Sequence, residues 1–381
     1  MSSRLLVNFE SKFKTSTITF VKNKLFYQSR KFYSLNQPKN SLINRSKFIC
    51  FESSKSRFTN QAEMKAQEIS VPVPWGDVKC QIFGDPTNKH AKPIISIHGF
   101  LDNSNSFKPL APFICQNDEF YIIALDLPGH GFSSKLPDGI PYTPKLFLAS
   151  VRRVIRHFGI NEFYFMCHSY GIHLSILYNI VFKNEVKALV SLDWIFSLPG
   201  YKIENYGDLW KTGIDGLIDI ENKEKTKNDA VQPKTLTKEL AVSILMKYNN
   251  HLDEDSAKIL IERALVKKEN GRFEFSRDIR VKQTVSMFDH YLDMSYLLPE
   301  IIKGIDVPWL MIHADPPAYG ERPATTTMNF MKQIEKNSKT SIQYEVFKGT
   351  HHFHMIQPKE TAEIILKFID RIAIKEKTSK L

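Results

Sequence analysis

The sequence predicts one α/β domain in which a mostly parallel central sheet is interrupted by a helical cap insertion. Three observations lead to this prediction. Short apolar segments alternate with helical patterns over residues 68–195, as expected for buried strands joined by crossover helices. Residues 196–300 then contain helical patterns and charged loops, with no convincing strand pattern. Strand patterns return at 307–313 and 341–347, and an amphipathic helix with proline in its first turn follows at 358–374.

The individual elements follow from local signals. The predicted strands cover 69–83 (two strands with a turn at 74–76), 93–97, 120–125, 162–167 and 186–192, and the predicted helices of this part cover 145–158 and 170–182. We therefore divide the chain into a basic extension (1–63), a core in two parts (68–195 and 301–375), a helical cap (196–300) and a short tail (376–381).

The positive charge lies almost entirely in the extension. Residues 1–60 contain twelve basic and two acidic residues and so carry +10 of the net charge of +11. The rest of the chain is nearly neutral, and no zinc-finger or aromatic-basic RNA motif is present, so we expect no nucleic-acid partner.

No apolar run approaches the length that spans a bilayer, and four scattered cysteines favour a reducing compartment.

The two termini of the chain suggest two different cellular compartments. The last three residues are Ser379-Lys380-Leu381, the tripeptide that a peroxisomal import receptor reads at a free carboxyl end. The extension is rich in Ser, Lys and Arg and poor in acids, which resembles a mitochondrial transit peptide. We expect the peroxisome, with the mitochondrion and the cytoplasm as alternatives, and a start at Met64 would reconcile the two ends.

The segment 163–171 contains the first candidate for catalysis, because an aromatic strand, a sharp turn and a helix follow one another. A nucleophilic serine in such a turn requires small residues two positions before and after it. Gly171 satisfies this rule, and Cys167 replaces the first glycine with another small residue. We predict that Ser169 is a nucleophile and that the backbone N–H of Tyr170 stabilises an oxyanion. An ordinary strand-to-helix turn remains the alternative for this segment alone.

A second motif supports that prediction. His98-Gly99-Phe100 follows the strand 93–97, and in this position the backbone N–H of Phe100 would be the second oxyanion donor. Glycine allows the backbone to approach a substrate closely. We expect His98 to brace the loop rather than to transfer protons.

The general base is predicted from the loop after the last strand. His351 follows Gly349-Thr350 and leads into the final helix, and serine before histidine is the chain order of this chemistry. His352 and His354 are expected to be packed or hydrated at the surface. Three histidines in four residues also fit a metal site, but no other set of His, Asp or Glu offers matching ligands, so we predict no metal and no cofactor.

Taken together, the motifs resemble those of the α/β-hydrolase superfamily, and more narrowly of the serine hydrolase-like (kraken-type) proteins. The resemblance covers about residues 68–375 and rests on Val73-Pro74-Trp75-Gly76, His98 to Asn103 with Ser106-Phe107, Gly129-His130-Gly131, His168-Ser169-Tyr170-Gly171, Arg277-Asp278, and His351 with His354. It implies the α/β-hydrolase fold, a cofactor-free hydrolase and a small-molecule substrate.

The acid that orients His351 has two candidates, because Asp193 and Asp315 each end a predicted strand. Many α/β hydrolases keep their acid near the position of Asp315, but here Pro317 occupies the expected place. Relatives of the kraken type keep an aspartate at the position of Asp193. The resemblance therefore favours Asp193, with Asp315 as the alternative.

These residues predict a serine hydrolase that cleaves a small, largely apolar carboxylic ester or thioester through an acyl-serine intermediate. The apolar preference rests on aromatic residues expected near the cap, among them Trp194, Phe196, Tyr206 and Trp210. Two alternatives remain open: a non-catalytic ligand-binding protein on the same fold, and a serine-dependent hydrolase of carbon–carbon bonds.

Overall fold

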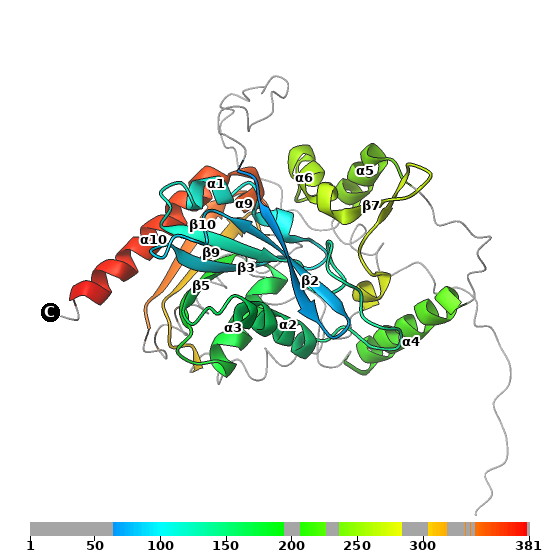
Figure 1. Cartoon of the computed structure of the whole chain (residues 1–381), viewed down its shortest axis with the longest axis horizontal. Coiled ribbons are helices and arrows are strands. Elements are labelled where there is room, and N and C mark those ends of the chain that lie inside the picture. The colour runs from blue at the N-terminus through cyan, green and yellow to red at the C-terminus, as the bar shows by residue number, and fades with distance from the viewer. Residues whose placement is uncertain are drawn as a thin grey trace, which may run out of the picture. The chain divides into compact units, whose positions relative to one another are not determined.

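The computed structural model describes residues 64–193, 206–225, 236–283, 304–317, 332, 336 and 340–378 (Figure 1). The extension 1–63 and the last three residues, on which the predicted addresses depend, lie outside the described residues.

Eight strands form one sheet in the order β1-β2-β4-β3-β5-β6-β9-β10. The first three neighbours pair antiparallel, β1 with β2 and β2 with β4, and every later pair is parallel. The strands are β1 (Gln67–Val73), β2 (Gly76–Phe83), β3 (Lys92–Ile97), β4 (Phe120–Leu125), β5 (Phe163–His168), β6 (Val186–Leu192), β9 (Trp309–Asp315) and β10 (Ile342–Lys348). The prediction of a mostly parallel central sheet is confirmed.

Helices cover both faces of this sheet. In Figure 1, α2 (Pro144–His157) and α3 (Tyr170–Val181) lie below the sheet, whereas α1 (Ala111–Ile114) and α10 (Pro358–Thr378) lie above it. Successive side chains of a strand point to opposite faces. In β5, Phe163 and Phe165 accordingly join the apolar cluster with α2 and α3, while Tyr164 and Met166 join the cluster with α1 and α10.

The helix boundaries follow from local chemistry. The hydroxyl of Thr143 accepts a hydrogen bond from the backbone N–H of Leu146, and Pro144 occupies the first turn of α2. At the other end of the chain, α10 continues to Thr378, so it enters the range predicted as a tail from residue 376. No Gly or Pro occurs between 374 and 378 to stop the helix.

The insertion between β6 and β9 is mainly helical in its described parts. It contains α4 (Tyr206–Lys225), α5 (Lys238–Tyr248), α6 (Glu254–Ala264) and the 3₁₀ helix η4 (Ile279–Gln283). The expectation that it lacks strands is wrong, because β7 (Leu265–Lys267) pairs antiparallel with β8 (Phe273–Phe275). Each strand has only three residues, which is too short for an alternating pattern to be recognised.

Polar contacts join the cap to the loop after β3. Helix α6 packs on the 3₁₀ helix η2 (Ser104–Phe107), where Asn103 Nδ2 donates to the carbonyl of Leu260 over 3.0 Å and Asn105 Nδ2 to that of Ile259 over 2.7 Å. Arg263 of α6 donates from Nε to Oδ2 of the fully buried Asp126 over 2.7 Å. The cap is thus fixed beside the loop that carries the predicted oxyanion donor.

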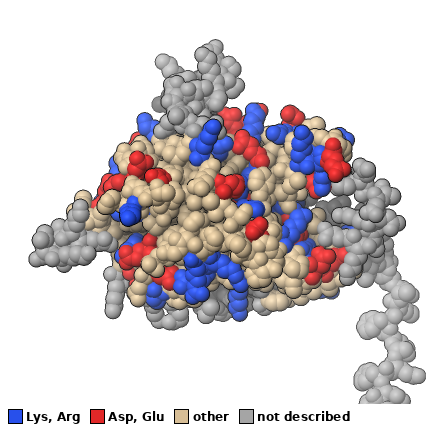
Figure 2. Space-filling model, in the orientation of Figure 1, with Lys and Arg blue, Asp and Glu red and all other residues tan. Residues whose placement is uncertain are grey.

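The surface charge of the body is mixed, as the near-neutral count predicts. On the face in Figure 2, the basic and acidic side chains of the described part are interspersed. Among the helices that the structure describes, none combines the length and the apolar character needed to cross a bilayer.

Candidate active site

Ser169 lies at the turn between β5 and α3 in a strained backbone conformation. Its φ of 48° and ψ of −116° are unusual for a residue with a side chain, and its N–H donates to the carbonyl of Leu192 over 3.2 Å. The turn also brings α3 against β3, since a Cβ at Gly171 would lie 2.2 Å from the carbonyl oxygen of Ile97. These are the features of a nucleophile elbow, and they distinguish this turn from an ordinary strand-to-helix connection.

Cys167 takes the place of the first small residue without disturbing the turn. It is fully buried in β5, between Ile97 of β3 and Ser191 of β6 in the strand register. Burial raises the pKa of its thiol to about 12. The thiol therefore stays protonated and is a packing group rather than a competing nucleophile.

His351 and Asp193 form a short hydrogen bond. The Nδ1–H of His351 donates to Oδ2 of Asp193 over 2.6 Å, and the backbone N–H of Ala314 donates to Oδ1 of the same carboxylate over 2.8 Å. Asp193 directly follows β6, is fully buried and has a φ of 55°. Asp315, the alternative acid, is exposed at the end of β9. The structure brings Asp193, and not Asp315, to His351.

The electrostatics of this pair keep the carboxyl ionised and the imidazole neutral. Burial alone raises the pKa of Asp193, but its contacts with His313 and His351 outweigh burial and hold that pKa below the ordinary value. Burial lowers the pKa of His351 to about 4, although the Asp193 carboxylate opposes this shift. Near neutral pH, His351 is therefore available to accept a proton at Nε2.

The loop after β3 approaches the elbow. The ring of Phe100 lies edge-on to that of Tyr170, with centroids 6.3 Å apart, so the two residues predicted to supply oxyanion donors are neighbours. His98 braces this loop: its Nδ1–H donates to the carbonyl of Gly99 over 2.7 Å, and its Nε2 accepts from the N–H of Leu127 over 3.1 Å. Of the aromatics predicted near the cap, Trp194, Phe196 and the side chain of Tyr206 lie outside the described residues.

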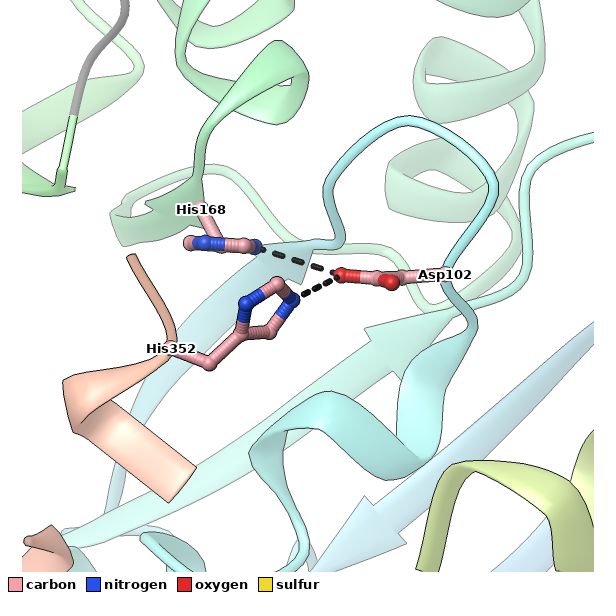
Figure 3. A group of neighbouring side chains, drawn as sticks. All are labelled: Asp102, His168 and His352. Atoms are coloured by element: carbon pink, nitrogen blue, oxygen red, sulfur yellow. Dashed lines mark hydrogen bonds and ion pairs between the residues drawn. The ribbon is translucent and has the colours of Figure 1, made fainter. Parts of the chain in front are cut away.

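A second group of polar side chains lies beside this site, and sequence reasoning did not assemble it (Figure 3). Asp102, His168 and His352 converge: Nε2–H of His352 donates to Oδ2 of Asp102 over 3.1 Å, and Nδ1 of His168 lies 3.4 Å from the same oxygen. His354 is also buried and lies 2.8 Å from Ser106 Oγ through Nε2. Of the two alternatives expected for His352 and His354, packing is confirmed and surface hydration is wrong, because both side chains are buried.

Asp102, His168 and His352 are also the described residues that could hold a metal ion, since their ligand atoms lie within 4.8 Å of one another. Asp102 and His352 already form a hydrogen bond with each other, so this contact is explained without a metal ion. No periodicity or local motif connects these three residues. The only signal in the sequence is that each stands within two positions of a predicted catalytic residue.

The fold and the site define an α/β hydrolase with a serine at the nucleophile elbow. The family model for the alpha/beta hydrolase fold matches residues 92–205, which contain β3, the elbow and the aspartate after β6. Among solved structures, the thioesterase domain from the curacin biosynthetic pathway is similar, with a TM-score of 0.63 and 21% identity over 80% of this chain and 99% of that domain. At this identity the likeness concerns the fold.

The sequence relatives identify the family. The serine hydrolase-like protein of Danio rerio is 28% identical over 82% of this chain and 90% of its own length. The human serine hydrolase-like protein is 30% identical over 44% of this chain and 80% of its own length. This chain belongs to the serine hydrolase-like proteins, which confirms the resemblance deduced from the motifs.

Proposed function

We propose that this protein hydrolyses small, largely apolar carboxylic esters or thioesters through an acyl-enzyme formed on Ser169. The observation that carries the proposal is the pairing of the strained serine with a buried His351–Asp193 hydrogen bond of 2.6 Å. His168, which directly precedes Ser169, has its ring centroid 4.6 Å from that of His351. The loop of the base and the elbow are thus in contact.

In the first half of the proposed reaction, Nε2 of His351 accepts the proton of Ser169 while Oγ attacks the carbonyl carbon. The backbone N–H groups of Phe100 and Tyr170 would stabilise the resulting oxyanion. Collapse of the tetrahedral intermediate breaks the bond to the leaving oxygen or sulfur, which takes the proton from His351. The products are an alcohol or thiol and the acyl-serine.

In the second half, His351 takes a proton from water, and the hydroxide attacks the acyl carbon. The bond to Ser169 Oγ then breaks, the serine regains its proton, and the carboxylic acid leaves. Throughout both halves, Asp193 holds the Nδ1–H of His351 and stabilises the imidazolium that forms twice.

The preference for an apolar substrate is supported by the residues around the elbow. Tyr170 contacts Phe100 and Phe147 edge-on, with centroids 6.3 Å and 6.0 Å apart. Phe147 and Tyr170 are buried in the core and Phe100 is only partly buried, so Phe100 is the ring of this group that a substrate at the elbow would meet, and it favours hydrocarbon groups over charged ones.

A fluorophosphonate probe tests the proposal, since it reacts covalently with an activated serine. The full-length protein is labelled, and the modified residue is mapped by mass spectrometry in the wild type and in Ser169→Ala and His351→Ala. We expect labelling at Ser169 in the wild type and in neither variant. Labelling that persists in Ser169→Ala refutes the assignment, and a folded wild type that does not label favours a ligand-binding protein. Turnover of simple esters, thioesters and β-diketones by protein that has not been treated with the probe then separates these substrates.

A further inference from the structure

The three segments that bear the proposed catalytic groups are joined behind the site by side chains. Asp102 follows Phe100 by two positions, His168 directly precedes Ser169, and His352 directly follows His351. These segments are far apart in sequence and come from different strand ends. Figure 3 shows that the three joining side chains meet at one carboxylate oxygen, Oδ2 of Asp102.

His168 connects this oxygen to the base. The Nε2–H of His168 donates to the backbone carbonyl of His351 over 3.0 Å. The opposite edge of the same ring places Nδ1, which carries no hydrogen when Nε2 is the donor of a neutral ring, 3.4 Å from Oδ2 of Asp102, so this is a packing contact and not a hydrogen bond. A displacement of the Asp102 carboxylate would therefore be transmitted to the backbone of His351 through the rigid imidazole ring of His168.

Gly99 makes the approach of these two groups possible. A Cβ at this position would lie 2.7 Å from Nδ1 of His168 and 3.2 Å from Oδ2 of Asp102. The absence of a side chain at Gly99 thus serves the contact between the loop after β3 and the elbow.

The contacts of Asp102 differ from those of an aspartate that only braces the fold. Asp126, also buried, accepts hydrogen bonds from the backbone N–H groups of Ser104 and Phe132 and from Arg263. Within the described parts of the chain, the Asp102 carboxylate instead contacts His168 and His352. Each of these histidines is a sequence neighbour of a proposed catalytic residue.

Burial strengthens the connection. The side chains of Asp102, His168 and His352 are 7%, 1% and 2% exposed. Burial raises the pKa of Asp102, but the contacts with His352 and His168 outweigh it and hold that pKa well below the ordinary value. A buried carboxylate is costly without a hydrogen-bond donor, so His352 is held firmly against Asp102, and His168 packs beside the pair.

We propose that Asp102 is a positioning residue that acts through His168 and His352 to hold the elbow, the oxyanion loop and the loop of the base in one arrangement. The expected effect on the rate of Ser169 labelling rests on the proposed function. The expected effect on the arrangement of the three segments does not. Asp102 acts at a distance from the reacting atoms, because its contacts are to groups that flank the catalytic residues.

The test compares Asp102→Ala and Asp102→Asn with Asp278→Asn in the full-length protein. Asp278 is a matched control, since it is also buried but bonds to Tyr142 and Arg280. The maximal rate of fluorophosphonate labelling and the probe concentration at half that rate are measured separately. We expect the maximal rate to fall about 10²-fold in Asp102→Ala, because a shift of about 1 Å in a catalytic group has this effect. Asp102→Asn keeps the shape of the side chain but removes its charge, and it replaces Asp102→Ala in the comparison if the alanine variant does not fold.

A second readout does not require activity. The proton shared by His351 and Asp193 is expected to give a low-field NMR signal that is lost in His351→Ala. We expect this signal to shift or broaden in both Asp102 variants and in Gly99→Ala, and to stay unchanged in Asp278→Asn. If the wild type does not label but the signal depends on Asp102, the proposed function fails and the positioning inference stands.

Three results would overturn the inference. The first is an unchanged signal together with an unchanged labelling rate in folded Asp102→Ala. The second is stoichiometric zinc in the purified wild type that is absent from Asp102→Asn, measured by elemental analysis, because the cluster would then be a metal site. A fall in labelling that only tracks the loss of folded protein, and that Asp278→Asn reproduces, would also contradict it.

Discussion

The Nδ1–H of His351 donates to Oδ2 of Asp193 over 2.6 Å and so joins the loop after β10 to the end of β6. Strand β9 lies between these two strands in the sheet, yet its own terminal aspartate, Asp315, points to solvent. This contact determines which carboxylate can orient the imidazole.

Replacing Asp193 is expected to remove most of the activity, whereas replacing Asp315 is not. In Asp193→Asn the amide oxygen is expected to keep the hydrogen bond from the N–H of Ala314, so the NH2 group faces Nδ1 of His351 and favours the wrong tautomer. This lowers the maximal rate of serine modification by about 10⁴-fold. Asp315→Asn changes an exposed side chain and is expected to leave that rate unchanged. Rates of fluorophosphonate labelling for the two variants give the comparison. Equal losses in both would contradict the assignment of the acid.

The pH dependence follows from the neutral state of His351. Because burial lowers its pKa to about 4, the rate of serine modification is expected to stay constant from neutral pH down to about pH 5 and to fall near pH 4. An unperturbed histidine would lose activity near its ordinary pKa of about 6.5. Labelling during brief exposure to each pH, followed by return to neutral buffer, checks this. A midpoint close to the ordinary value would show that burial does not lower the pKa of the titrating base.

The lowered pKa of His351 also makes the free energy of unfolding depend on pH, and the direction of this dependence follows from the shift. The folded-state pKa of His351 is below its unfolded value, so the unfolded chain binds more protons between about pH 4 and pH 6.5. The contribution of neutral His351 is therefore present above this window and is lost as pH falls through it. We expect His351→Gln to show a smaller loss of unfolding free energy than the wild type across this window. Urea unfolding at several pH values measures the difference, and parallel curves would contradict it.

The elbow depends on the close approach of α3 to β3. A Cβ at Gly171 would lie 2.2 Å from the backbone oxygen of Ile97, which cannot move without disturbing the sheet. Gly171→Ala is therefore expected to lower the melting temperature and to abolish labelling at Ser169. Gly207→Ala is the matched control, because nothing lies within 4 Å of its Cβ and alanine in a helix gains about 0.5–1 kcal/mol over glycine. Equal melting temperatures for the two variants would contradict this account.

Anchoring of the cap depends on Arg263. Its guanidinium bonds to the fully buried Asp126 and to Glu68, so Arg263→Met leaves the Asp126 carboxylate without its charged partner. We expect the free energy of unfolding to fall by about 3–5 kcal/mol, the usual effect of breaking a buried ion pair. Lys258→Ala, which removes an exposed pair with Glu254 on the same helix, is expected to leave the free energy of unfolding nearly unchanged. Chemical denaturation compares them, and similar values would show that the pair is not buried in solution.

The fold class and two residues of the candidate site, Ser169 and His351, can be predicted from the amino-acid sequence alone. Both belong to local patterns: a strand, a turn with small flanking residues and a helix for Ser169, and a strand, a glycine and a proline-started helix for His351. Such patterns depend on backbone conformation within a few residues, so they can be recognised without a tertiary structure.

The aspartate that contacts His351, and the other side chains that surround this histidine, become known only from the three-dimensional structure. Asp193 and Asp315 both end neighbouring strands, and although Pro317 and the family resemblance favour Asp193, the sequence leaves both open as the partner of a histidine from a third strand end. Asp102, His168 and His352 likewise meet because β3, β5 and the loop after β10 end at the same edge of the sheet. Contacts between residues far apart in sequence depend on strand order and loop direction, which the whole core fixes together.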